Sequence, residues 1–453
     1  MSFYEKGEYA KARVEFRHAI VVDHKFAESH YMIGMIEIRE KNWERSRGPL
    51  YKAVELNPDF ADAEVALGNV FLITEEWTKA KKRAEHVLAK SPDHQGALLL
   101  EAACLMADQK EQKAEPILKS LIQKNPKKAE PYLMLARSVL KRGEMVRANN
   151  ILRDLLVQDE KNQTARLLLA EVLEKNDDFS EAENEYKQLV HQNPETQHFK
   201  LLLVKFYCRT KQIKEAEKIL KDLVVSSPEK EANRLALAQF YAEERRNRAM
   251  IEVLREAMKD LPENYGPYEV LAKYYFEIKS YDMAIKVLDN FAKRVERGPG
   301  LLRSKVLKAS IFFEKKQYDS ALRLVQEVLS ENPGDVKAHT LKADIMMIQQ
   351  DYASAVAEYR QVLYEEPQNI PIALGLARAH LLNNEPLLAE QTYKNILKQN
   401  TEVTQARFAL ADIYRRRGEI DRATDQLEKV LEREPENIKA LSMLGAITLK
   451  KEP

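Results

Sequence analysis

The stretch AESHYMIGMIEIREKNWERSRGPLYKAVELNPDF, residues 27–60, is one period of a pattern that runs through the chain. Small residues lie where helices must approach closely, and large apolar residues fill the space between them. Near its end stands Asn57-Pro58, and a proline disfavours helix in the residue before it. The stretch therefore predicts two amphipathic helices joined by a tight turn.

Three series of residues repeat this unit in the same register. Mostly small residues recur every 34 residues, except for one step of 37 before Ala321, at Ala12, Ser46, Ala80, Ala114, Ala148, Ala182, Ala216, Met250, Ala284, Ala321, Ala355, Ala389 and Ala423. A second series precedes the first by twelve residues, from Gly34 and Gly68 to Ala411, and a third places proline near the end of most units, as at Pro92 and Pro126. The chain is thus predicted to be a tandem array of helix pairs.

The register divides the sequence into units. Residues 27–298 hold eight repeats of 34 residues and residues 302–437 hold four more, while residues 1–26 and 438–453 each supply part of a repeat. A solenoid normally shields its terminal apolar faces with polar caps. The half-repeats predict a piece of a longer protein, with a signal, an anchor or a second domain outside this sequence.

The stretch RVERGPGLLRS, residues 294–304, explains the single step of 37 residues. Three extra residues, 299–301, are assigned to an insertion between two repeats, and we expect a lengthened loop there. A phosphate-binding loop would need the pattern G-x-x-x-x-G-K-[ST], which this stretch lacks.

Composition limits the function. The net charge is +1, so no global field favours nucleic acid, and no apolar run is long enough to span a membrane. Two cysteines and nine scattered histidines show no metal-binding spacing, and no spacing of acidic residues indicates a catalytic cleft. We expect an all-α, non-enzymatic protein without a cofactor or metal.

The repeat resembles the tetratricopeptide repeat (TPR) over nearly the whole chain. The resemblance rests on the small-residue series and the proline series described above. It also rests on Leu67-Gly68, Leu135-Ala136, Tyr207, Tyr241, Tyr275 and Tyr414. It implies a right-handed superhelical α-solenoid that binds protein or peptide partners in a concave groove lined by the first helices. Some TPR proteins use sets of Lys and Asn residues to bind the carboxylate termini of chaperones. This sequence lacks those sets, which disfavours a co-chaperone function.

Two sets of residues are expected to line that groove. The fifth place of successive repeats is apolar, at Val65, Leu99, Leu133, Leu167, Leu201 and Leu235. These residues form either a strip that holds a partner's apolar side chains or the packing between adjacent first helices.

The ninth and thirteenth places carry cations at Arg137, Lys141, Lys175, Lys205, Arg209 and Lys273. They turn acidic further along, at Glu243, Glu277, Glu314 and Asp344. Such a polarised groove would fix the direction of a bound peptide, although charges on exposed helix faces are also ordinary.

Phrases such as YEKGEYAKARVEFRHAI give a narrower resemblance, to long bacterial TPR proteins that include exported lipoproteins of exopolysaccharide and exosortase (PEP-CTERM) systems. It implies a scaffold of the periplasm or outer membrane. Two alternatives stay open: the substrate-selecting arm of a larger enzyme such as a glycosyltransferase, and self-association through exposed half-repeats and the apolar strip.

Overall fold

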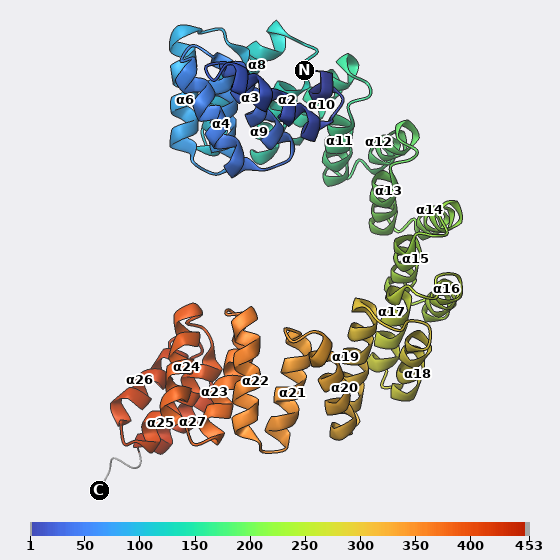
Figure 1. Ribbon diagram of the computed structural model, residues 1–453, viewed down its shortest axis with the longest axis vertical. Coiled ribbons are helices and arrows are strands. Elements are labelled where there is room, and N and C mark those ends of the chain that lie inside the picture. The colour runs from blue at the N-terminus through green and yellow to red at the C-terminus, as the bar shows by residue number, and fades with distance from the viewer. Residues whose placement is uncertain (1, 449–453) are drawn as a thin grey trace. The chain divides into compact units, whose positions relative to one another are not determined.

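The computed structural model describes residues 2–448, and all regular secondary structure in that range is α-helical (Figure 1). The chain divides into two compact units that meet at residues 219 and 220, inside helix α14 (Ile213–Ser226). The expected all-α repeat solenoid is confirmed. The units are described one at a time below.

The helices that precede α14 belong to the first unit. Their bounds are α1 Ser2–Glu5, α2 Tyr9–Val22, α3 Ala27–Arg39, α4 Trp43–Leu56, α5 Ala61–Ile73, α6 Trp77–Lys90, α7 Gln95–Ala107, α8 Glu111–Lys124, α9 Ala129–Lys141, α10 Met145–Gln158, α11 Gln163–Lys175, α12 Phe179–Gln192 and α13 Gln197–Arg209.

The helices that follow α14 belong to the second unit. Their bounds are α15 Glu231–Glu243, α16 Asn247–Asp260, α17 Tyr265–Glu277, α18 Tyr281–Ala292, α19 Pro299–Glu314, α20 Tyr318–Glu331, α21 Val336–Ile348, α22 Tyr352–Glu365, α23 Ile370–Leu382, α24 Pro386–Gln399, α25 Thr404–Arg416, α26 Ile420–Leu431 and α27 Ile438–Thr448.

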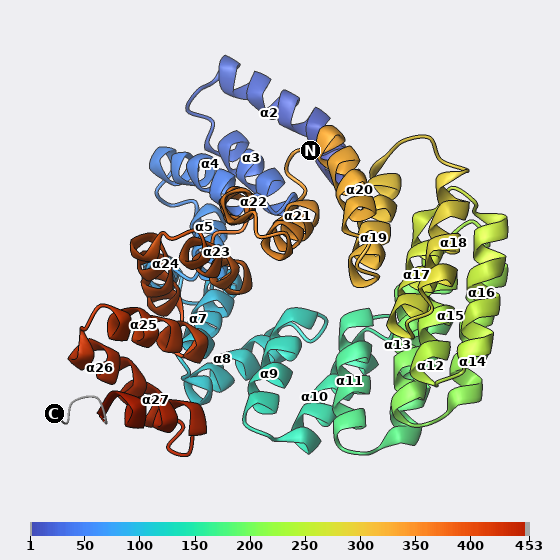
Figure 2. The same ribbon diagram turned by 90° about the horizontal axis from the view of Figure 1, so that it is seen from below.

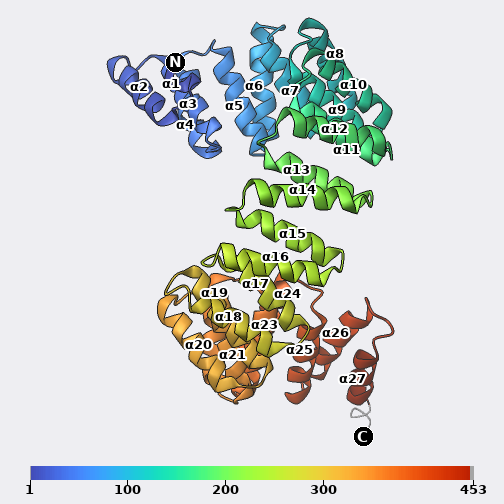
Figure 3. The same ribbon diagram turned by 90° about the vertical axis from the view of Figure 1, so that its right-hand side faces the viewer.

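Small residues allow the two helices of a pair, and neighbouring pairs, to pack closely. Within the first unit α9 packs against α10, and within the second α15 packs against α16 (Figures 2 and 3). Ala80 and Ala148 are fully buried, as are most members of the first small-residue series. A Cβ on Gly68 would lie 2.3 Å from Leu100 Cδ2, a distance that no real contact tolerates. Larger residues at these positions would force the helices apart.

The turn inside each pair depends on one residue in the left-handed region. Positive φ recurs at Lys41, Glu75, Gln109, Gly143, Asp177, Lys211, Arg245, Lys279, Lys316, Gln350, Asn384 and Gly418. In the first of these turns Asn42 N donates to Glu37 O at 2.8 Å, which satisfies a carbonyl left over at the helix end. Backbone hydrogen bonds fix these turns, and glycine holds the left-handed position in only two of them, at Gly143 and Gly418, with Gly7 at the equivalent place between α1 and α2.

The junction between α18 and α19 differs from the expected lengthened loop over 299–301. Those three residues form the first turn of α19, and the linking segment is 293–298. Gly298 has φ +124°, which side chains rarely allow, and Pro299 starts the helix, where its missing N–H costs nothing. A Cβ on Gly300 would lie 3.0 Å from Tyr265 Cβ and 3.2 Å from Phe291 Cζ. Each residue of the Gly-Pro-Gly sequence thus has a structural role.

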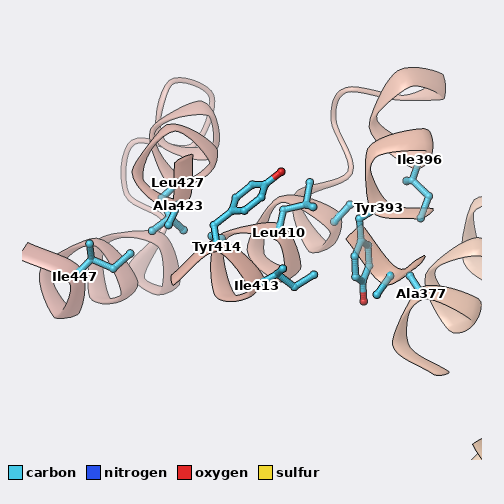
Figure 4. Close-up of a cluster of buried hydrophobic side chains, with 12 residues drawn as sticks. Ala377, Tyr393, Ile396, Leu410, Ile413, Tyr414, Ala423, Leu427 and Ile447 are labelled. Carbon is cyan, nitrogen blue, oxygen red and sulfur yellow. The ribbon is translucent and has the colours of Figure 1, made fainter. Parts of the chain in front are cut away.

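Buried apolar clusters extend over the helices of neighbouring repeats. In the last repeats of the second unit, Tyr393 of α24, Leu410 of α25 and Leu427 of α26 belong to one buried cluster (Figure 4). Ile447 of α27 joins the same cluster (Figure 4). Each repeat therefore completes its core against its neighbours, as in other stacked repeats.

Candidate functional site

The predicted cations lie on exposed faces of first helices. Arg137 and Lys141 lie on α9, Lys175 on α11, and Lys205 and Arg209 on α13, all in the first unit. We call these five residues the basic stripe. The sixth predicted cation, Lys273, lies on α17 of the second unit and is described separately.

Carboxylates already neutralise two members of the basic stripe. Lys141 Nζ lies 2.6 Å from Glu111 Oε1, and Arg209 Nη2 lies 2.7 Å from Glu174 Oε2. The hydrogen bond from Lys141 lowers the pKa of the Glu111 carboxyl. In the second unit Lys273 Nζ lies 2.6 Å from Glu269 Oε1 on its own helix. A partner would have to compete with these carboxylates.

The other three stripe residues have no carboxylate partner in the described part of the chain. No ion pair involves Arg137, Lys175 or Lys205 within residues 2–448, and all three side chains are exposed. They lie on first helices of three successive repeats. An acidic group could approach them without displacing a carboxylate of the protein.

The apolar residues at the fifth place divide into two groups. Val65 and Leu99 are each only 9% exposed, whereas Leu133, Leu167 and Leu201 are partly exposed. Val65 packs in one cluster with Ala97 of the next first helix. The contact of Val65 with Ala97 indicates packing between adjacent first helices. Leu99 has little exposed surface that a partner could contact.

The packing interpretation extends to the second unit. Leu235 Cδ1 lies 3.0 Å from the position of a Cβ on Gly266, in the following first helix. Leu133, Leu167 and Leu201 keep some exposed surface beside the basic stripe. Packing between first helices therefore accounts for Val65 and Leu235, while the other interpretation stays a prediction for Leu133, Leu167 and Leu201.

The acidic series belongs to the second unit, and its members differ. Glu243, Glu277 and Glu314 are exposed. Asp344 is partly buried and accepts a hydrogen bond from the Tyr359 hydroxyl at 2.6 Å, and burial raises the pKa of its carboxyl. Asp344 therefore contributes to packing between α21 and α22 more than to surface charge.

A second group of cations lies on or just after second helices, whereas all the cations predicted from the sequence lie on first helices. Arg255 and Lys259 of α16, Lys286 of α18, and Lys293 and Arg294 after α18 line a groove in the second unit. Lys259 and Lys293 are 34 residues apart, so they occupy the same place in successive repeats. The repeat register could have revealed that part of the pattern.

Within residues 2–448, no group of His, Cys, Asp and Glu side chains has the arrangement of a metal site. In the same range no helix is both long and apolar enough to cross a bilayer. The Glu115 carboxyl, whose pKa falls to about 2, is surrounded by Arg142, Lys119 and Arg147. This shift reflects an ion-pair network between neighbouring helices.

Comparison with protein families identifies the repeat. A model described as tetratricopeptide repeat matches residues 71–138, 105–172, 139–202, 175–239, 346–402 and 384–447. A second model of the same description matches residues 306–370. A comparison with curated proteins gives no match.

Solved structures with similar helix arrays were also found. Yeast Tom70 is 17% identical with a TM-score of 0.41, and the match covers 94% of this chain and 96% of Tom70. The Cut9–Hcn1 hetero-tetramer structure is 14% identical with a TM-score of 0.39, covering 98% of this chain and 94% of the matched one. The Pseudomonas aeruginosa pilF structure is 20% identical with a TM-score of 0.38, covering 48% and 97%.

Proposed function

Because this chain belongs to the tetratricopeptide repeat family, we propose that it is a scaffold that binds a partner protein along the first helices of its first unit. TPR proteins generally mediate protein–protein interactions, and a pure repeat fold is typical of non-enzymatic scaffolds. The bound element would be an extended peptide or a helix with an acidic stretch and apolar side chains.

One observation carries the proposal. Arg137, Lys175 and Lys205 are exposed cations without ion pairs in the described chain, and they recur on three successive first helices. The partly exposed Leu133, Leu167 and Leu201 lie on the same three helices. An acidic segment with apolar anchors matches both features, because charge sets its orientation and buried apolar contacts supply most of the affinity.

The test is affinity capture from the native source with immobilised protein, quantified by mass spectrometry. The variant Arg137→Glu/Lys175→Glu/Lys205→Glu is compared with wild type. A matched control, Lys127→Glu/Lys161→Glu/Lys214→Glu, changes three exposed cations of the same unit at other places of the repeat. We expect a partner that wild type and control retain and the stripe variant loses. Equal recovery by all three proteins would contradict the proposal.

The narrower proposal, that the scaffold works in a bacterial cell-envelope export or assembly system, rests only on the resemblance to long bacterial TPR proteins. Fractionation of source cells, followed by immunoblotting, tests it: recovery with the envelope supports this proposal, and recovery elsewhere contradicts it. No feature of the described chain favours the alternative of a substrate-selecting arm of an enzyme.

A further inference from the structure

A groove of about 930 Å³ lies within the second unit, between α16 and α18. One wall is formed by Arg255, Met258 and Lys259 of α16, and the base includes Leu271 and Tyr275 of α17. The opposite wall belongs to α18 and to the residues that follow it. The groove therefore involves second helices, whereas the basic stripe lies on first helices.

The α18 wall presents a row of side chains on one helical face. Met283, Lys286 and Asn290 are spaced by three and four residues, so they lie above one another along the helix. Because α18 ends at Ala292, Lys293 and Arg294 extend from the following turn at the rim. Arg294 Nε donates to Asn290 Oδ1 at 3.4 Å, which holds the rim against the wall.

Five cations line this groove, and both carboxylates among its lining residues are engaged elsewhere. Asp289 pairs with Lys308, and Asp282 Oδ1 lies 2.7 Å from Lys315 Nζ. Both of these lysines come from α19 or its C-terminal end and do not line the groove. Within residues 2–448, no ion pair neutralises Arg255, Lys259, Lys286, Lys293 or Arg294. The groove thus keeps a net positive charge although the whole chain is nearly neutral.

Apolar surface accompanies the charge. Met283 is 41% exposed at the wall, and Met258 and Tyr275 lie deeper, at 9% and 8% exposure. The Arg255 guanidinium lies 3.5 Å from the Tyr275 hydroxyl oxygen. Methionine adapts its shape to different apolar groups, so this surface could accept an aliphatic or aromatic side chain.

We propose that this groove is a second docking site, which binds a short acidic segment of a partner protein with one or two apolar residues in the middle of that segment. The cations would contact the carboxylates, and the surface around Met283 would contact the apolar residues. A nucleic acid fits less well, because the groove offers methionine and a largely buried tyrosine instead of exposed aromatic faces for base stacking.

The experiment uses the full chain and defined fluorescein-labelled probes, measured by fluorescence anisotropy. The main probe is the peptide EELFEE, with QQLFQQ and EESSEE as peptides that lack the charge or the apolar pair. A twelve-residue oligo-dT tests the nucleic-acid alternative. The groove variant is Arg255→Glu/Lys286→Glu. Its matched control is Lys337→Glu/Lys398→Glu, which reverses two exposed cations of the same unit outside the groove.

We expect the groove variant to bind EELFEE about tenfold more weakly, since two attractive contacts become repulsive, while the control matches wild type. Met283→Ser should weaken EELFEE more than EESSEE. Circular dichroism should show that all variants remain folded, because the changed side chains are exposed.

Three results would overturn the proposal: equal affinity of wild type and the groove variant for EELFEE, equal affinity of wild type for EELFEE and QQLFQQ, or tighter binding of oligo-dT than of EELFEE. The Arg137→Glu/Lys175→Glu/Lys205→Glu variant separates the two surfaces. If the stripe variant lost EELFEE binding and the groove variant kept it, the peptide would be assigned to the basic stripe, and the groove proposal would be refuted. Failure of the stripe proposal would leave the groove result unchanged.

Discussion

The basic stripe and the α16–α18 groove carry similar numbers of cations but differ in what surrounds them. In the stripe, Glu111 and Glu174 already hold Lys141 and Arg209. In the groove, Asp282 and Asp289 are engaged by lysines from α19, so the groove cations remain without carboxylates. A count of charges along a repeat therefore does not identify a binding surface. Which carboxylates remain free to neutralise those charges matters as much.

The largest expected effect disturbs the helix that supports the groove. A Cβ at Gly300 would press on Tyr265 and Phe291, and Phe291 lies on α18. Gly300→Val should lower the free energy of unfolding of the second unit by about 2 kcal/mol. Urea unfolding with hydrogen exchange would measure this, with Gly334→Val as the control, since a Cβ there meets nothing closer than 4.0 Å. Comparable losses in both variants would contradict the close-packing argument.

The next largest effect concerns the ion pairs between Glu115 and its neighbouring cations in the first unit. The pKa of Glu115 is lowered to about 2 from 4.5, so its ion pairs stabilise the fold above pH 4.5, and this contribution is lost as the pH falls toward 2. After allowance for solvent screening, Glu115→Gln should cost about 1–2 kcal/mol at pH 7 and almost nothing at pH 2. Thermal unfolding of both proteins across that range measures the difference. A difference that does not change with pH would show that packing, and not charge, explains the loss.

A smaller gain in stability is expected beside the groove. Lys279 has φ +58° in the turn between α17 and α18, a region that glycine enters without steric cost. Lys279→Gly should stabilise the second unit by about 0.5–1 kcal/mol, since relief of strain exceeds the added flexibility of the unfolded chain. Because Lys279 does not line the groove, EELFEE affinity should stay constant. A change in that affinity would mean that the groove extends to this turn.

The smallest effect would make the stripe resemble the groove. Glu111→Gln/Glu174→Gln removes the carboxylates that hold Lys141 and Arg209. The affinity of the stripe for an acidic partner should rise about two- to threefold, as expected for exposed charge pairs. Titration in the Arg255→Glu/Lys286→Glu background isolates the stripe from the groove. Unchanged affinity would show that Lys141 and Arg209 do not reach the bound partner.

Much of the fold could be predicted from sequence because the repeat imposes strict steric demands. The small residues at Ala80 and Ala148 are recognisable from spacing alone, and both are fully buried. The start of α19 could not be predicted in this way. It depends on the close approach of Gly300 to Tyr265, a residue 35 positions earlier in the chain.

The candidate site was harder to predict than the fold. Spacing located Arg137 and Lys175 on exposed first-helix faces, but it could not show that Glu111, 30 residues before Lys141, neutralises that lysine. The groove was missed for a related reason. Its positive charge depends on ion pairs in which Lys308 and Lys315 neutralise two aspartates of the groove wall. Such pairs arise only from tertiary packing.

The extra turn at the start of α19 has a genetic consequence. Nine additional nucleotides at this point lengthen the helix at its start, so Ala309 and Ala321 keep their twelve-residue separation and both remain fully buried. The same three codons placed inside α19, after Ala309, would rotate the rest of the helix by about 60° and turn apolar residues outward. Repeat boundaries are therefore the places where genes of this kind can change length without disturbing the core.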